Sequence, residues 1–303
     1  MTPDPAEMLL RLHDAEADNH LAPSDSEAPS SGLRSDLARI LLFDPPVVAV
    51  ANASDPWFAK MKEVIGPWHW TPAEVLSIIS PGATAHSVIA WCLPISEPIR
   101  RSNRDETEFP SRPWAMARTK ADGILMRMSE GLERMLRDLG FAAVAPVRLA
   151  RQPDDPRPPG SLSARWSLRH VAFVAGLGTF GISGGLITER GIAHRLGSVV
   201  TDAPIPATPR AYGDDPFAWC LRSARGTCGA CIQRCPVGSI GESVHARNIP
   251  ACYNYRERIR ALARGRYDWE SAHYGCGLCQ AGVPCESRNP TGEVRSSKLE
   301  TRK

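Results

Sequence analysis

The chain has 303 residues, of which 43% are hydrophobic and 23% are charged, and its formal net charge is +3. These values are ordinary for a globular protein with room for two domains, and the charge is too small to indicate a partner by itself. The N-terminus, MTPDPAEMLL, lacks the basic start of a secretory signal, and no apolar run is long enough to span a membrane. We therefore expect a cytoplasmic protein with no membrane partner, in a compartment where thiols stay reduced.

Residues 1–35 are expected to form a flexible N-terminal segment. A short helical pattern at Met8–Leu12 precedes a run rich in serine and proline at residues 22–32, which has little apolar surface to bury. The pattern then changes to that of an α/β protein. Val47–Val50 and Val88–Leu93 are short, mostly apolar runs of the kind found in buried strands.

Two helices are predicted in the α/β part. The first begins at Pro72 and extends to Ile79, because Thr71 can cap it and Glu74 follows three residues later. The second has apolar residues at three- and four-residue steps and ends at Gly140, before a strand expected at 141–147. Its apolar positions are Ala117, Ala121, Ile124, Leu125, Met128, Leu132, Met135, Leu136 and Leu139.

Prolines divide the chain into its expected domains. Residues 154–160 are rich in aspartate and proline and predict a loop, and a second proline-rich stretch runs from Pro204 to Pro216. We place a boundary at the second stretch, which gives an α/β domain over residues 36–205 and a cysteine-rich domain over 206–286. The polar tail at 287–303 is expected to be disordered.

Eight of the nine cysteines lie between positions 220 and 285, and six of them spell C-x2-C-x3-C-P followed by C-x2-C-x5-C. Two sets of four thiolates are the ligands of two cubane iron–sulphur clusters, and two-cluster ferredoxins contain the same C-x3-C-P step. In that pattern the cysteine before proline ligates the other cluster. The predicted sets are Cys220, Cys228, Cys231 and Cys285 for one cluster, and Cys235, Cys252, Cys276 and Cys279 for the other. Cys92 is left over.

Zinc and disulfides are the alternatives for these cysteines. A zinc ribbon also uses paired C-x2-C units, but it needs only four ligands and no cysteine–proline step. A disulfide framework is typical of small secreted proteins, unlike this chain. The unusual feature of the cluster pattern is Cys220, because seven residues separate it from Cys228 where the standard run has two.

A glycine-rich loop, AGLGTFG at 175–181, contains the spacing G-x-G-x-x-G of dinucleotide-binding proteins, and Asp202 follows about twenty residues later. However, the segments 183–185 and 188–191 have the composition of turns instead of the helix that a nicotinamide site requires. Gly176, Gly178 and Gly181 could instead let the backbone approach another large, flat ligand, or could only allow tight packing between elements.

The same loop, with Arg169-His170 before it, Leu196–Asp202 after it and a two-cluster cysteine region beyond, resembles the epoxyqueuosine reductase family. The resemblance covers roughly residues 80–286. It implies an α/β (α+β) nitroreductase-like domain that holds cobalamin, followed by a bacterial two-cluster ferredoxin-like domain with two 4Fe-4S clusters. It also implies that Gly176, Gly178, Gly181 and Asp202 lie beside the cobalamin.

The sequence departs from this family in three places. Members that reduce the modified tRNA base carry an aspartate about a dozen residues before AGLG as proton donor, whereas residues 161–166 contain no acid. Some members continue into a helical-repeat region that helps to grip tRNA. In addition, Glu286 follows Cys285 where a proline is usual. His170 is then the candidate proton donor, because the pKa of histidine lies nearest to neutral pH.

We therefore predict an iron–sulphur oxidoreductase that passes electrons from two clusters to cobalamin and reduces an unidentified substrate. The electrons would come from an external donor such as ferredoxin or flavodoxin, and the substrate would be a small molecule or a nucleoside. An arginine-rich run at 256–266 could contact phosphates of tRNA, although such runs are more often solvated helix faces. The alternatives are a ferredoxin-like electron-transfer protein without cobalamin and a flavin or nicotinamide reductase.

Overall fold

The computed structural model describes residues 2–21, 40–149, 163–267 and 275–292. The predicted linker at 22–32 and the predicted loop at 154–160 lie outside these residues, as does most of the predicted tail. The predicted N-terminal helical pattern lies in α1 (Pro5–Asp14). This helix packs so closely on α5 (Arg112–Asp138) that a Cβ atom at Gly131 would lie 2.3 Å from Leu12. This part of the segment expected to be flexible is therefore packed against the fold.

The central sheet has four strands in the order β1 (Val47–Asn52), β2 (Ser87–Pro94), β6 (His194–Thr201) and β3 (Ala143–Val144). All of its neighbouring strands are antiparallel. The two strands predicted from apolar runs are confirmed as β1 and β2. The strand predicted at 141–147 is wrong in its length, because only two residues pair before α6 (Pro146–Leu149) begins.

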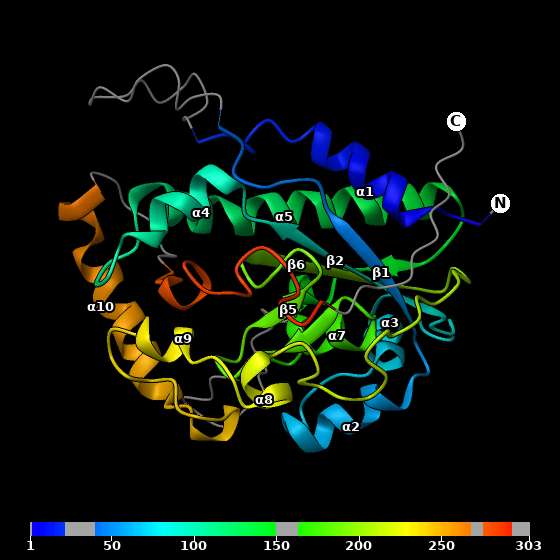
Figure 1. Ribbon diagram of the computed structural model, residues 1–303. Helices are drawn as coiled ribbons and strands as arrows, with labels where there is room; N and C mark the ends of the chain where they lie inside the picture. The colour runs from blue at the N-terminus through cyan, green and yellow to red at the C-terminus, as the bar shows by residue number, and fades with distance from the viewer. Residues whose placement is uncertain (1, 22–39, 150–162, 268–274, 293–303) are drawn as a thin grey trace.

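Both faces of this sheet are covered, which explains why β2 is buried at all eight positions. Its side chains alternate between two cores, with Val88, Ala90 and Cys92 on one face and Ile89, Trp91 and Leu93 on the other. In Figure 1, α5 and α1 lie on one side of the sheet, with α4 (Glu97–Arg104) beside them. The helices α2 (Pro56–Val64), α3 (Pro72–Ile79) and α7 (Leu168–Val174) lie on the other side.

Both predicted helices are confirmed. The helix α3 has the bounds expected from the sequence, and its capping box joins Thr71 and Glu74 in both directions. The methionine-bearing stripe lies in α5, where Met128 and Leu132 are buried in the core. The apolar spacing of α5 therefore reflects packing against the sheet, as the periodicity indicates.

A β-hairpin, and no helix, follows the glycine loop. The strand β4 (Gly178–Phe180) pairs with β5 (Leu186–Thr188) across the turn at 183–185. The G-x-G-x-x-G spacing is therefore not part of a strand–loop–helix unit, which is the structure that a dinucleotide-binding site of this type requires. The turn composition of residues 183–185 is the sequence signal that predicts this outcome.

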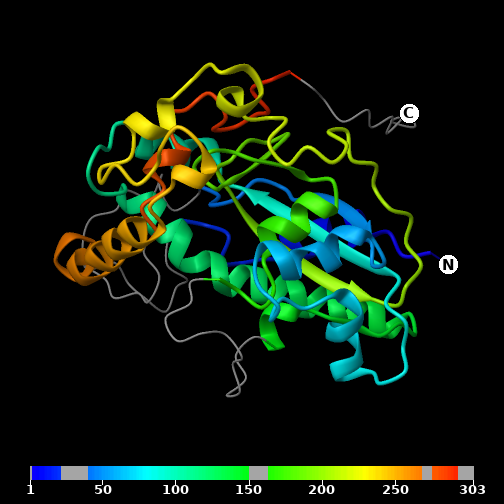
Figure 2. The ribbon, with the colours of Figure 1, turned by 90° about the horizontal axis from the view of Figure 1, so that it is seen from below.

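The cysteine-rich segment consists of short helices and loops around one longer helix. These are α8 (Leu221–Arg225), α9 (Ala230–Gln233), η2 (Val244–Ala246), α10 (Ile249–Tyr267) and η3 (Leu278–Gln280). Figures 1 and 2 show them gathered to one side of the sheet. Trp219, Ile240 and Val283 belong to the same buried cluster as Phe173 and Phe180, so the hydrophobic core continues across the boundary expected near residue 206.

No helix in the described part of the chain has the length and apolar character needed to cross a membrane.

Candidate functional site

The first group of cysteines surrounds a small cavity that Cys220, Cys228, Cys231 and Cys285 line together. Cys220 precedes α8, Cys231 lies in α9, and Cys228 occupies the loop between them with a φ of 75°. Burial, followed by the nearby Cys220 and Cys228, raises the pKa of the Cys231 thiol to about 11. Burial, followed by Cys231, Cys220 and Cys228, likewise raises the pKa of Cys285. The four thiols of one predicted cluster thus lie close together.

The second group lines a different cavity and consists of Cys235, Cys252, Cys276 and Cys279. Burial, together with the nearby Cys252 and Cys235, raises the pKa of Cys276 to about 11. Cys235 differs from the others. Burial opposes its ionisation, but hydrogen bonds from the Ser239 side chain and from backbone amides outweigh burial and lower its pKa. The Ser239 amide lies 3.2 Å from the Cys235 sulphur, so this site is built to accept a thiolate.

The chemistry of both groups suits soft metal ions. All nine cysteines are described, and none of them forms a disulfide. Buried thiols with a raised pKa stay protonated at neutral pH until a metal replaces the proton, and thiolates are the ligands of iron–sulphur clusters. Among the described residues, no three His, Cys, Asp or Glu side chains converge as they would on a single metal ion.

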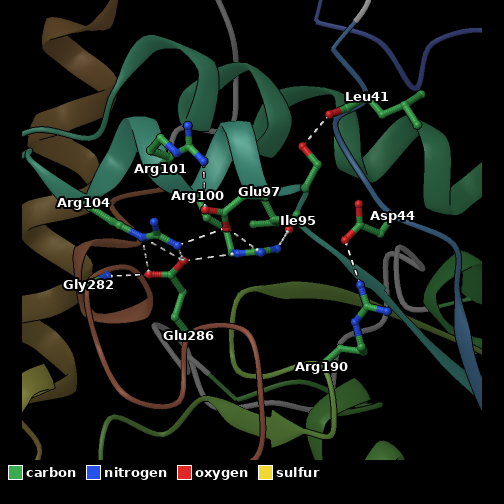
Figure 3. A network of polar contacts seen from close by, with 11 residues as sticks. Leu41, Asp44, Ile95, Glu97, Arg100, Arg101, Arg104, Arg190, Gly282 and Glu286 are labelled. Carbon is green, nitrogen blue, oxygen red and sulfur yellow. Dashed lines mark hydrogen bonds and ion pairs between the residues drawn. The ribbon is translucent and has the colours of Figure 1, made fainter.

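Glu286, which stands where a proline is usual, holds the end of the first cysteine group against α4. Its carboxylate is 6% exposed and accepts hydrogen bonds from Arg100 at 3.2 Å, from Arg104 at 2.6 Å and from the Gly282 amide at 2.7 Å. Figure 3 shows this carboxylate between the two guanidinium groups. Burial opposes its ionisation, but Arg104 and Gly282 outweigh it and lower the pKa of Glu286. Glu286 therefore forms a buried ion pair that connects the residue after Cys285 to α4.

The cavity beside the second cysteine group has a volume of about 520 Å³, which is within the range of small-molecule pockets. Its walls come from α5, the start of α7, β6 and α10, and include apolar side chains such as Trp166 and Leu196. Its charged lining residues are Arg118, Asp122, Arg169, Arg195, Arg247 and Arg256. The cavity thus places the thiols of one predicted cluster, an apolar surface and several cationic groups around the same space.

Packing within the protein accounts for the glycines at 176 and 178. A Cβ atom at Gly178 would lie 2.0 Å from the Ile187 carbonyl oxygen, and one at Gly176 would lie 3.2 Å from that of Pro209. The structure describes both residues, and neither lines the large cavity. The alternative of tight packing is thus supported at these two positions, and the expected ligand contact stays a prediction. Gly181 lines the small cavity beside Cys220.

The structure places Asp202 and His170 outside the lining of the large cavity, although both are described. The Asp202 carboxylate accepts a hydrogen bond from the Ala142 amide at 2.8 Å and secures the edge of the sheet. His170 lies 2.7 Å from the Ser167 hydroxyl, and its ring packs on Phe180. Burial, followed by the charge of Arg169, lowers the pKa of His170 to about 4. His170 is therefore neutral at pH 7, and its location does not support the predicted role of proton donor.

Two lining residues of β6, His194 and Arg195, were missed by the sequence analysis. The Nε2 atom of His194 lies 2.8 Å from the Leu186 carbonyl oxygen, while its Nδ1 atom is buried without a partner in the described residues. Burial lowers the pKa of His194 to about 4. The sequence signal that could have identified them is their position, because a histidine and an arginine are unusual at the start of a mostly buried strand.

Comparisons with solved structures show where a similar fold occurs. A catabolic reductive dehalogenase bound to 3-bromo-4-hydroxybenzoic acid matches with a TM-score of 0.50 and 13% identity, over 94% of this chain and 36% of that one. Epoxyqueuosine reductase from Bacillus subtilis matches with a TM-score of 0.48 and 18% identity, over 84% of this chain and 65% of that one. Epoxyqueuosine reductase in complex with a tRNA stem loop matches with a TM-score of 0.47 and 18% identity, over 83% of this chain and 62% of that one.

The chain has the reductive dehalogenase fold. The resemblance expected from the sequence is supported at this level, with a mixed α/β architecture and a small antiparallel sheet. No family model matches the sequence, and no curated protein is similar enough to match. The chain spans about two thirds of the length of the epoxyqueuosine reductases and about a third of the dehalogenase. These comparisons identify the fold and leave the activity to be argued from the site.

Proposed function

We propose that this protein is an iron–sulphur reductase with two 4Fe-4S clusters and a corrinoid cofactor. One observation carries the proposal: the eight clustered cysteines line two separate cavities in groups of four, and the second group borders a cavity large enough for a ligand. Four thiolates are the ligand set of one cubane cluster, so the arrangement fits two clusters with one of them beside the ligand.

The exposure of the two groups supports a direction for electron transfer. Cys228 of the first group is exposed, whereas the four cysteines of the second group are half-buried and line the large cavity. An external donor such as ferredoxin or flavodoxin would therefore reach the first cluster. The second group would hold the cluster that borders the cavity, where a reduction would need electrons.

The apolar part of the cavity lining suits a corrinoid ring. Trp166, Leu196 and Ile192 offer an apolar wall for a flat ring, and the cysteines of the second group form the side nearest the cluster. Bound there, the corrinoid would supply the cobalt-centred reductive chemistry. The protein's residues would orient the substrate, a small molecule or a nucleoside, and exclude water. The corrinoid proposal does not require Gly176 or Gly178 to contact the ring.

Cobalamin binding is tested by filling the cavity. Leu168 lines it at the start of α7, and Leu168→Trp adds volume to the proposed ring site without removing a cysteine. We expect the wild-type protein to bind cobalamin in an anaerobic titration followed by cobalt-sensitive absorption. The variant should bind at least about tenfold more weakly, as a steric clash of about 1.4 kcal/mol or more would cause. Its iron content should not change.

The control is Leu139→Trp, a matched substitution at an exposed leucine at the end of α5. It should bind cobalamin like the wild-type protein. Absence of binding by the wild-type protein would contradict the corrinoid proposal and would favour an electron-transfer protein without cobalamin.

A further inference from the structure

The large cavity has an excess of positive charge. Five arginines line it, and Asp122 is the one carboxylate among the described lining residues. Asp122 lies 2.7 Å from Arg118 in an ion pair on α5, so its charge is already shared. A ligand that enters this space therefore meets guanidinium groups that outnumber the carboxylates.

The cysteines of the second group account for part of this charge. Arg247 Nη2 lies 4.0 Å from the Cys252 sulphur, and Arg256 favours ionisation of Cys276. The negative charge of a thiolate-ligated cluster would offset these two arginines. Arg195 is different, because its charged neighbours are Arg118, Asp122 and Arg256 and include no cysteine.

The guanidinium group of Arg195 has few hydrogen-bond partners. Its Nη1 atom has a long contact of 3.5 Å with the His194 carbonyl oxygen, and its Nε atom is buried with no hydrogen-bond partner among the described residues. Desolvation, followed by the repulsion of Arg118, lowers the pKa of Arg195 to about 9. A buried donor without a partner is costly, and an oxyanion supplies the two acceptors that a guanidinium group binds best.

His194 lines the cavity next to Arg195 and provides a hydrogen-bond acceptor. Its side chain is buried, and because Nε2 donates to the Leu186 carbonyl, the neutral ring leaves the unpartnered Nδ1 atom as an acceptor. A ligand that satisfies both residues would carry an anionic group for Arg195 and a hydroxyl or amino donor for His194.

We propose that the cavity binds a small molecule with a phosphate or carboxylate group, held by Arg195 with Arg118 beside it, and with a hydrogen-bond donor held by His194. That this molecule is the substrate rests on the reductase function proposed above, whereas the anion site itself rests on the cavity alone. Phosphate and carboxylate groups are both oxyanions, and the titration with phosphate, pyrophosphate and succinate distinguishes between them.

The test is anaerobic calorimetric titration of the purified protein with inorganic pyrophosphate, inorganic phosphate and succinate at constant ionic strength. We expect at least one of them to bind the wild-type protein, and the tightest one to indicate phosphate or carboxylate. Arg195→Gln should weaken that binding about ten- to a hundredfold, as loss of a charge-assisted hydrogen bond does. Arg195→Lys keeps the charge but loses the planar fork, so its effect should be intermediate.

Arg101→Gln is the matched control, because Arg101 is an exposed arginine of α4 that does not line the cavity. It should bind the anion like the wild-type protein. Equal loss in both variants would show a general charge effect and would overturn the proposal, as would no binding of any of the three anions. All variants should retain the wild-type iron content, which shows that the fold and clusters survive.

Cobalamin and cobinamide separate the substrate from the cofactor, because cobinamide lacks the phosphodiester of the nucleotide tail. If Arg195→Gln weakened only cobalamin binding, the oxyanion would belong to the cofactor and the substrate assignment would be overturned. Pyrophosphate binding by a protein without iron would support the anion site while rejecting the clusters. Eight irons without anion binding would reject the anion site alone.

Discussion

Replacing either Cys228 or Cys276 by alanine should remove about half of the iron, from about eight atoms per chain to about four. The two residues lie in different groups, since Cys228 borders the small cavity and Cys276 the large one. Each variant leaves three thiols in one group and four in the other. The measurement is iron and acid-labile sulphide per chain after anaerobic purification.

Cys92→Ala is the control for this experiment. Cys92 is fully buried in β2, and burial raises the pKa of its thiol to about 12. It lies apart from both groups, so its loss should leave the iron content unchanged. Cys220→Ala should behave like Cys228→Ala despite its unusual spacing. A normal iron content in Cys220→Ala would contradict the proposed ligand set.

Gly178→Ala should destabilise the protein by about 3 kcal/mol or more, because the added methyl group meets backbone that cannot move easily. The new Cβ atom would lie 2.0 Å from the Ile187 oxygen, within the β4–β5 hairpin. The expected result is a large fall in the midpoint of thermal or denaturant unfolding. Reduced ligand binding in this variant would then follow from misfolding.

Gly265→Ala provides the matched comparison. Gly265 lies in α10, where an added Cβ atom would have no neighbour within 4 Å. Alanine favours helix over glycine, so this variant should be about 0.5–1 kcal/mol more stable than the wild-type protein. If Gly178→Ala kept wild-type stability, packing would not explain the glycine, and a ligand contact at this loop would regain support.

Local signals allowed much of the fold to be predicted from the sequence. Thr71 and Glu74 identify the start of α3 because both partners of a capping box are encoded within four residues. The apolar run of β2 likewise indicates burial on both faces. The antiparallel order of the sheet was not predicted, because strand pairing joins residues such as Ala90 and Ser198 that are distant in sequence.

The candidate site was also predicted only in part from the sequence. The spacing of the cysteines predicts two groups of four, and the structure brings these same groups together around two cavities. The role of Gly178 could not be read from its motif, because it depends on Ile187 in the following strand. His194 and Arg195 likewise acquire their place in the cavity only when β6 joins the sheet.

The most direct test of the central claim is metal analysis of the wild-type protein, purified without oxygen and combined with its absorption spectrum. The proposed function predicts about eight irons and about eight acid-labile sulphides per chain, with a broad charge-transfer band near roughly 400 nm. Roughly one or two zinc ions per chain, with no acid-labile sulphide, would contradict it.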